Sequence, residues 1–335
     1  MKEVLVAPDI STKIIDSPIP EADENDVVVK VVFAGSNPKD WKYPEWAEHT
    51  HNSGDDIAGV VHSVGKNVFE FKPGDRVAAF HRMNTPGGAF AEYAVAPAVT
   101  TFHIPKTTSF EEAATIPLAA MTAALALFIR LDLPQPWSQG RQDGKEGKPV
   151  GPLLIYGAAS AVGAYAIQLA KRANIGPIIA VAGRGIPFVQ TMLGPEDSIV
   201  DYRKGNDSVV SEIKAALKGQ KLKYTLDAVS DKGSFQNASK VMDSGHITLV
   251  LPGNDHSTIP STIGHSITRV GLAYAEQSDF GMAWYRLFSK GLLQGWLKGH
   301  PYEVRGGLEA VSGALKDLKA GKNSGTKYIF KVADA

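Results

Sequence analysis

The sequence predicts an α/β protein with two domains, a small β-rich barrel and a doubly wound parallel sheet. Three observations support this prediction. The chain has 335 residues, enough for about two domains. Its first third reads as short strands separated by Gly and Pro, without a long helix. From Pro152 onward, strands alternate with helices, which is the pattern of a parallel sheet covered by helices.

The first third of the chain contains the elements of the barrel. We expect strands at 27–33, 57–64, 76–80 and 89–95, with a turn at Lys72-Pro73-Gly74-Asp75. Ser109 and Glu112 form a capping-box pattern for a helix at 110–116, which Pro117 ends. A second apolar helix follows at 118–131. The polar segment 133–149, rich in Gly and Pro, is expected to be a surface loop.

In the rest of the chain, stretches with the period of a strand alternate with stretches with the period of a helix. We expect strands at 153–156, 178–182, 198–200, 225–229 and 247–251, and a last strand of this sheet at 269–274. Helical patterns fill the intervals between them. An aromatic-rich helix at 279–298, a helix around Leu308–Leu318 and a closing strand at 327–332 complete the chain.

A turn of small residues follows the first strand of the alternating part. Its residues are Gly157, Ala158, Ala159, Ser160, Ala161, Val162 and Gly163. A strand, a tight turn and a helix N-terminus in succession offer N–H groups and a positive dipole end to a pyrophosphate. The middle glycine of G-x-G-x-x-G is absent, so a turn without a ligand is the alternative. Because this turn directly follows the first strand of the parallel sheet, a dinucleotide site is favoured.

Composition restricts the classes of function. Apolar residues make up 44% and charged residues 21% of the chain, as in a soluble globular protein. The 35 basic residues equal the 35 acidic residues, so nothing calls for nucleic acid or a membrane surface, and we expect a cytoplasmic protein. The absence of cysteine excludes disulfides, thiol catalysis and thiolate-bound zinc.

Several motifs resemble the medium-chain dehydrogenase/reductase superfamily over nearly the whole chain. They are Gly54-Asp55-Asp56-Ile57-Ala58-Gly59, Phe71-Lys72-Pro73-Gly74-Asp75-Arg76-Val77, Gly87-Gly88-Ala89-Phe90-Ala91-Glu92-Tyr93, Phe110-Glu111-Glu112-Ala113-Ala114 with Pro117, and the Gly157–Gly163 turn. The chain looks like the zinc-free quinone-oxidoreductase-like branch. Asn37-Pro38-Lys39-Asp40-Trp41-Lys42 and Asp201-Tyr202-Arg203 resemble the fungal subgroup that includes trans-acting enoyl reductases. The resemblance implies a GroES-like catalytic domain at 1–120 and 280–335, and a Rossmann domain at 121–279.

This chain differs from the zinc-containing members of the superfamily at the positions of the metal ligands. Those members have a cysteine near the position of Asn37 and a Gly-His-Glu where this chain has Gly54-Asp55-Asp56. A tetrahedral zinc would therefore have too few ligands. His49 and His51 could suggest a metal, but two loop histidines do not complete a ligand set. We expect no metal site.

The second strand of the parallel sheet is followed by Gly183 and Arg184. A site for NAD would place an acidic residue there to bind the ribose hydroxyls, whereas an arginine suits a 2′-phosphate. Tyr202 is a candidate to stack on the adenosine or to bond its phosphate. NADPH is therefore the expected cofactor. The alternative is that Arg184 is a solvated loop residue.

The resemblance also implies a set of site residues. Lys42, Asn37 and Thr122 are the expected catalytic residues: Lys42 would bind the nicotinamide ribose or donate to the substrate oxygen. Both Lys42 and Thr122 would also contact the cofactor. Further expected cofactor contacts are Lys39, Asp40, Trp41, Leu251, Pro252, Gly325 and Thr326. The alternatives are a solvated lysine at 42 and a structural threonine at 122.

These expectations together predict a zinc-independent reductase that transfers hydride from NADPH to an activated C=C or a quinone. Without a metal to polarise a ketone, the acceptor must take hydride readily by itself. The acceptor is a small molecule or a carrier-tethered enoyl thioester, and a homodimer is a further option. The alternatives are a non-catalytic NADPH-binding protein on the same fold and, less favoured, a secondary alcohol dehydrogenase.

Overall fold

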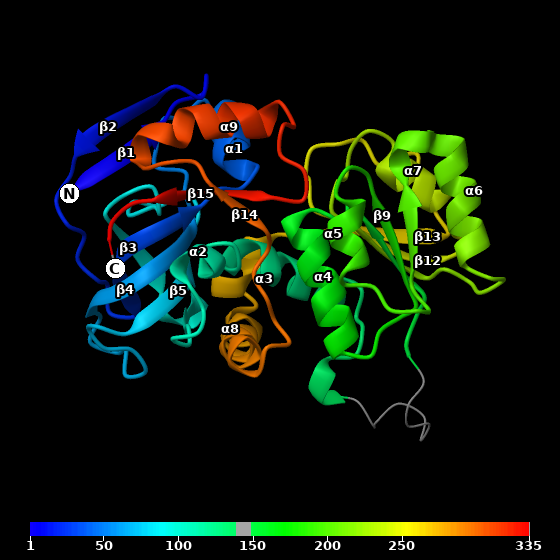
Figure 1. Ribbon diagram of the computed structural model, residues 1–335, viewed down its shortest axis with the longest axis horizontal. Coiled ribbons are helices and arrows are strands. Elements are labelled where there is room, and N and C mark those ends of the chain that lie inside the picture. Colours follow the sequence, from blue (N-terminus) through cyan, green and yellow to red (C-terminus); the bar gives the residue numbers. More distant parts are fainter. Residues whose placement is uncertain (139–148, 335) are drawn as a thin grey trace. The chain divides into compact units, whose positions relative to one another are not determined.

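The computed structural model describes residues 1–138 and 149–334. Contacts divide the chain into two compact units. Unit 1 contains Met1–Met121 and Gly271–Ala335, and unit 2 contains Thr122–Val270 (Figure 1). The loop expected at 133–149 lies mostly outside the described residues. The roles expected for the two parts, a substrate domain and a cofactor domain, stay predictions.

Unit 1 is built on a seven-stranded sheet and a two-stranded hairpin. The sheet order is β14-β15-β3-β4-β5-β7, with β6 also paired to β3. The hairpin strands are β1 (Lys2–Val6) and β2 (Thr12–Asp16), and the sheet strands are β3 (Asp26–Gly35), β4 (Asp56–Val64), β5 (Arg76–Phe80), β6 (Tyr93–Pro97), β7 (Thr101–His103), β14 (Tyr302–Val304) and β15 (Lys327–Lys331).

Strand β3 organises this sheet because it pairs with three other strands. Its first half pairs with β6 and its end pairs with β15, while β4 pairs along most of its length. The closing strand of the chain thereby lies beside an early strand, as the red and blue ribbons of Figure 1 show. This pairing brings Lys327 and Tyr328 next to the turn that follows β3.

The helices of unit 1 connect and cover these strands. They are α1 (Lys39–Ala47), α2 (Phe110–Ala113), α8 (Ser278–Gln294) and α9 (Val311–Lys319), and α3 (Pro117–Leu125) runs on into unit 2. The Ser109 cap is confirmed, since its hydroxyl accepts from the Glu112 N–H at 3.1 Å. The Glu112 side chain does not complete the box; it accepts from the N–H of Gly299 at 2.8 Å.

Unit 2 contains a six-stranded sheet in which every pair is parallel. Its order is β10-β9-β8-β11-β12-β13, so the strand order reverses direction between β8 and β11. The strands are β8 (Leu153–Tyr156), β9 (Ile178–Ala182), β10 (Ser198–Asp201), β11 (Tyr224–Asp227), β12 (Gly245–Leu249) and β13 (Ile263–Ile267). The predicted doubly wound parallel sheet is confirmed, and ligands of such sheets bind where the order reverses.

Helices connect successive strands of unit 2. They are α4 (Ala161–Arg172), α5 (Ile186–Gln190), α6 (Asn206–Ala216) and α7 (Ser234–Ser239). Crossovers between parallel strands are right-handed, so α4 with α5 and α6 with α7 cover opposite faces. Figure 1 shows this pairing of the helices.

The prediction of a strand at 269–274 is wrong. Val270–Tyr274 is a 3-10 helix, and the strand at this edge of the sheet, beside β12, is β13. A short apolar run does not distinguish strand from helix by its periodicity. A Cβ on Gly271 would lie 3.0 Å from the Tyr274 hydroxyl and 3.3 Å from Met83, so this segment packs within unit 1.

The stretch Phe110–Arg130 is the one part of the described chain that is long and apolar enough to cross a membrane. Within the structure, 89% of its most apolar window is buried. The stretch contains α2, α3 and a π-helical turn at Ala126–Arg130. Its burial is that of a core helix in a soluble protein.

Candidate functional site

The turn after β8 has the backbone geometry that a dinucleotide loop needs. Gly157 has a φ of 77°, which side chains rarely adopt. The N–H groups of Gly157 and Ala158 both donate to the Val181 carbonyl, at 3.0 and 2.9 Å, and so attach the turn to β9. The turn therefore lies at the carboxyl edge of the sheet, beside the reversal between β8 and β11.

Gly163 allows helix α4 to approach this turn. A Cβ at position 163 would lie 2.4 Å from the Gly157 carbonyl oxygen and 2.7 Å from the Ala158 Cα. Ser160 caps the helix, because its hydroxyl accepts from the Gly163 N–H at 3.1 Å. The remaining predicted contacts of the turn, Ala159, Ala161 and Val162, are the neighbours of this cap. These features fit a pyrophosphate at the α4 N-terminus.

The residues predicted to bind the adenosine end of the cofactor follow β9 and β10. The Tyr202 ring lies over Gly183, where a Cβ would come within 2.5 Å of the ring. Tyr202 is 48% exposed, and Arg184 beside Gly183 is exposed as well. Arg203 is turned toward Asp201, to which its Nε and Nη2 donate at 2.6–3.1 Å.

The loop after β12 holds Leu251 and Pro252, and it is attached to the end of β11. The Ser230 hydroxyl donates to the Asp227 carbonyl and accepts from the Val250 N–H, each at 2.8 Å. Asp227 is buried and accepts from the N–H groups of Val229 and Ser230. These bonds fix the carboxyl ends of two neighbouring strands.

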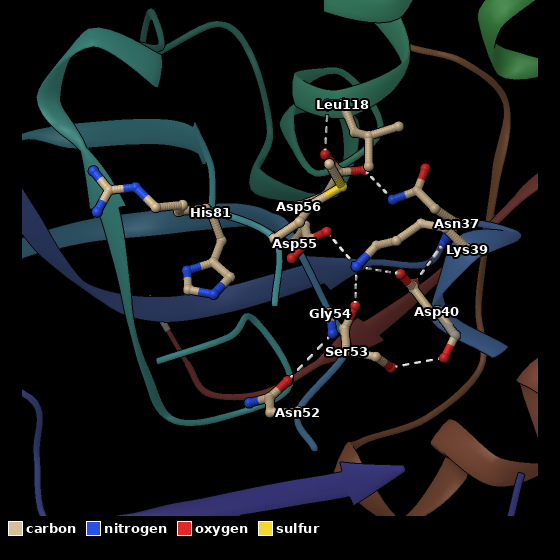
Figure 2. A network of polar contacts seen from close by, with 12 residues as sticks. Asn37, Lys39, Asp40, Asn52, Ser53, Gly54, Asp55, Asp56, His81 and Leu118 are labelled. Atoms are coloured by element: carbon tan, nitrogen blue, oxygen red, sulfur yellow. Dashed lines mark hydrogen bonds and ion pairs between the residues drawn. The ribbon is translucent and has the colours of Figure 1, made fainter. Parts of the chain in front are cut away.

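In unit 1, a buried polar network surrounds the turn between β3 and α1 (Figure 2). The Asn37 amide N–H₂ donates to Asp56 Oδ2 at 2.8 Å, and its oxygen accepts from Lys327 Nζ at 3.1 Å. Both ends of this amide therefore have partners inside the protein. Its predicted catalytic role stays a prediction.

Asp56, at the start of β4, is surrounded by donors. Oδ2 accepts from Asn37 and from the Lys327 ammonium, and Oδ1 accepts from the Leu118 N–H at 2.7 Å. Lys327 and Asp56 form a buried ion pair that connects β15 with β4. This network fixes the Asn37 side chain relative to the first turn of α3.

Asp55 and Asp40 share a different lysine. The Lys39 ammonium contacts Asp55 Oδ2, lies 3.3 Å from Asp40 Oδ1 and donates to the Ser53 carbonyl. Asp40 Oδ2 accepts from the Asn37 N–H at 2.7 Å. Figure 2 shows Lys39 among these three acceptors. The structure thus brings the predicted residues Asn37, Lys39 and Asp40 together.

The side chains around Gly54-Asp55-Asp56 do not fit a tetrahedral zinc. Asp55 and Asp56 face the ammonium groups of Lys39 and Lys327, which would repel a second cation. In the described ranges, no group of three or more His, Cys, Asp or Glu side chains could hold a metal. His49 and His51 stack on each other at 5.5 Å between ring centroids.

The other predicted site residues have separate environments. Lys42 lies on α1 with its ammonium 5.1 Å from the Trp41 ring centroid and 5.6 Å from that of Trp46. Thr122 is buried on α3, at the first position of unit 2. Gly325 (φ 63°) and Thr326 directly precede β15.

Sequence reasoning missed Lys327. Lys327 is the first residue of the predicted closing strand, and a lysine at such a position is usually solvated. The available signal was indirect: adjacent carboxylates at 55 and 56 before a buried strand require cationic or N–H partners. Nothing in the sequence identified which lysines supply them.

Similarity to known proteins agrees with this architecture. Residues 23–106 match the family described as the alcohol dehydrogenase GroES-like domain. Among solved structures, the chain is similar to the CurK enoyl reductase, with a TM-score of 0.80, 20% identity and coverage of 99% of both chains. It is also similar to the mycobacterial protein Rv1454c in complex with NADPH, with a TM-score of 0.76, 19% identity and 99% coverage of both chains.

A relative with higher identity is the trans-enoyl reductase fsr4 of Gibberella fujikuroi. It is 49% identical over 310 residues, which cover 91% of this chain and 90% of the relative. This similarity spans both units and identifies the protein as an oxidoreductase. The chain therefore belongs to the trans-enoyl reductases within the medium-chain dehydrogenase/reductase superfamily.

Proposed function

We propose that this protein is a zinc-independent reductase that uses NADPH to reduce the C=C bond of an enone or enoyl thioester. Quinones are a second class of acceptor. The observation that carries the proposal is the similarity to a trans-enoyl reductase along nearly the whole chain. Zinc independence is supported by the lysines that face Asp55 and Asp56.

The residues of unit 2 fit a nicotinamide dinucleotide. The Gly157–Gly163 turn and the N-terminus of α4 would hold the pyrophosphate, with Gly163 giving the close approach. Tyr202 and Arg184 would hold the adenosine end and its 2′-phosphate. When bound, the cofactor supplies the hydride. Thr122 would contact the cofactor near the nicotinamide. Lys42, a residue of unit 1, is proposed to bind the nicotinamide ribose or to donate to the substrate oxygen.

The proposed activity is tested by acceptor assays. The protein is mixed with NADPH and with phenanthrenequinone, an α,β-enone or an enoyl thioester of N-acetylcysteamine, and NADPH absorbance is followed. Oxidation with the enone or the thioester supports the proposal. Binding of NADPH without oxidation by any acceptor favours the alternative of a non-catalytic binding protein. Stoichiometric zinc that is needed for turnover would contradict zinc independence.

The preference for NADPH is tested at Arg184. Arg184→Ala should weaken NADPH binding about 10- to 100-fold, because a charge-assisted hydrogen bond is worth about 1.5–3 kcal/mol. Binding of NADH should not change. Arg203→Ala is the matched control, since Asp201 holds that arginine. Equal losses for NADPH and NADH, or a wild-type preference for NADH, would contradict the assignment.

A further inference from the structure

Val229 lies against the turn that is proposed to hold the pyrophosphate. It follows β11, and a Cβ added at Gly157 would come within 2.7 Å of its Cγ2. Gly157 itself follows β8, so the two residues lie at the ends of neighbouring strands, at the point where the strand order reverses. Val229 is nevertheless 36% exposed, which leaves part of its side chain open to a ligand.

Asp227, the last residue of β11, fixes the backbone around Val229. Its Oδ1 accepts from the Val229 N–H at 3.0 Å and from the Ser230 N–H at 2.8 Å. Its Oδ2 accepts from the hydroxyl of Ser234, the first residue of α7. A single exposed valine needs no explanation. This valine differs because a fully buried carboxylate, with a donor on each oxygen, holds its backbone in place.

Ser230 attaches the same segment to the loop after β12. Its φ is 57°, a left-handed conformation that few non-glycine residues adopt. The Ser230 hydroxyl accepts from the Val250 N–H at 2.8 Å, and the Ser230 carbonyl accepts from the Asn254 amide. Such a conformation persists where the surrounding structure determines it, and it is common at ligand sites. The position of Val229 is therefore set before any ligand binds.

The strand order indicates which part of the cofactor reaches Val229. Neighbouring strands follow each other in the order β10, β9, β8, β11 and β12. Tyr202 and Arg184, which are proposed for the adenosine end, follow β10 and β9, and the Gly157 turn follows β8. Val229 lies on the other side of that turn. A dinucleotide that crosses the reversal with its adenosine end at β9 therefore has its nicotinamide half at β11.

We propose that Val229 is the apolar contact for the nicotinamide half of NADPH, and that Asp227 and Ser230 position it. This inference rests on the proposed function. A ribose ring presents C–H groups on its faces, which a valine side chain covers without binding the hydroxyls. Because the segment is already ordered, binding does not have to fix it, and less of the interaction energy is lost.

Three ligands separate the two halves of the cofactor. NADPH and NADH contain the nicotinamide half, whereas adenosine 2′,5′-bisphosphate contains only the adenosine end. Binding of each is measured by calorimetry, and thermal unfolding of each variant reports on folding. Val229→Ala is compared with Val304→Ala, a control in unit 1 at a valine that is 46% exposed.

We expect Val229→Ala to weaken the binding of NADPH and of NADH about 10-fold each, the effect of removing two methyl groups from an apolar contact. Binding of the bisphosphate should not change, and Val304→Ala should bind all three ligands like wild type. Unchanged NADPH binding by Val229→Ala, or an equal loss for the bisphosphate, would overturn the contact alone. A wild-type protein that binds neither dinucleotide would overturn the proposed function together with this inference.

Asp227→Ala tests the positioning role, and Ser230→Ala tests it if Asp227→Ala does not fold. Either variant should weaken NADPH binding about 2- to 10-fold, because the segment must then be ordered on binding. Binding of the bisphosphate should stay at the wild-type level. Asp227→Asn should restore NADPH binding, since its amide oxygen can still accept from both N–H groups. Folded variants that lose both ligands equally, or neither, would show that the two residues only stabilise the fold.

Discussion

At the residue scale, the adjacent carboxylates Asp55 and Asp56 have different partners. Asp56 accepts from an amide, an ammonium and a backbone N–H, so both of its oxygens are used. Among the described residues, the polar partner of the Asp55 carboxylate is the Lys39 ammonium, which contacts one of its oxygens. A carboxylate saturated with donors is suited to holding the fold, whereas an unsaturated one can exchange a proton with its partner.

His300 gives a prediction at the same scale. Burial, and then the Lys327 charge, lower its pKa to about 3. The unfolded chain binds a proton at this histidine below about pH 6.5, but the folded chain does not until about pH 3. Its contribution to stability is therefore lost as pH falls from 6.5 toward 3.

Lowering the pH from 6.5 to 4.5 should reduce the free energy of unfolding by about 2 kcal/mol through His300, at about 1.36 kcal/mol per pKa unit. The measurement is urea unfolding of wild type and His300→Gln across this range. The difference in free energy of unfolding between wild type and His300→Gln separates the effect of His300 from that of other titrating groups. A difference that does not change with pH would show that His300 titrates normally in the folded protein.

At the scale of elements, the contact between α4 and the turn after β8 is possible because Gly163 has no side chain. The atoms that a Cβ at position 163 would meet belong to the backbone of Gly157 and Ala158. Backbone atoms cannot rotate away, so either the helix or the turn must move. Because that turn is the expected pyrophosphate site, stability and cofactor binding should change together.

Gly163→Ala should lower the free energy of unfolding by about 1–3 kcal/mol, the usual cost of overpacking. It should also weaken NADPH binding, measured by fluorescence titration. Gly313→Ala in α9 is the matched control, since nothing lies within 4 Å of its added Cβ. That control should be more stable by about 0.5–1 kcal/mol, because glycine disfavours helix interiors. NADPH binding by Gly163→Ala at wild-type strength would place the pyrophosphate elsewhere.

At the scale of the whole molecule, the two units are discontinuous in sequence. Unit 1 is completed only when Gly271–Ala335 joins Met1–Met121, whereas unit 2 is one continuous segment. The turn and Tyr202, which are predicted to bind the dinucleotide, belong to unit 2, and the lysine–carboxylate network belongs to unit 1. Binding at unit 2 should therefore be detectable without any substrate.

NADPH at 100 times its Kd should raise the free energy of unfolding by about 2.7 kcal/mol, from mass action alone. Thermal unfolding with and without NADPH measures this increase. Hydrogen exchange should place the strongest added protection at the amides of Gly157–Gly163. Stabilisation with protection confined to unit 1 would contradict the assignment of the cofactor loop.

Local patterns in the sequence determined the elements, the parallel sheet and the family. Alternating periods, the Ser109 cap and the Gly157 turn are each specified by a few neighbouring residues, so they could be identified without coordinates. The short run at 270–274 could not be identified, because five apolar residues fit a strand and a 3-10 helix equally well. Packing within unit 1 selected the helix.

Only the tertiary structure decided the partners of the buried charges. The sequence located Asp55 and Asp56 at the position of the zinc ligands of related enzymes and showed that those ligands were missing. It could not show that Lys327, 271 residues away from Asp56, pairs with one carboxylate and Lys39 with the other. Pairing between β15 and β3 brings Lys327 there, and a contact of that kind depends on strand order and register rather than on sequence neighbours.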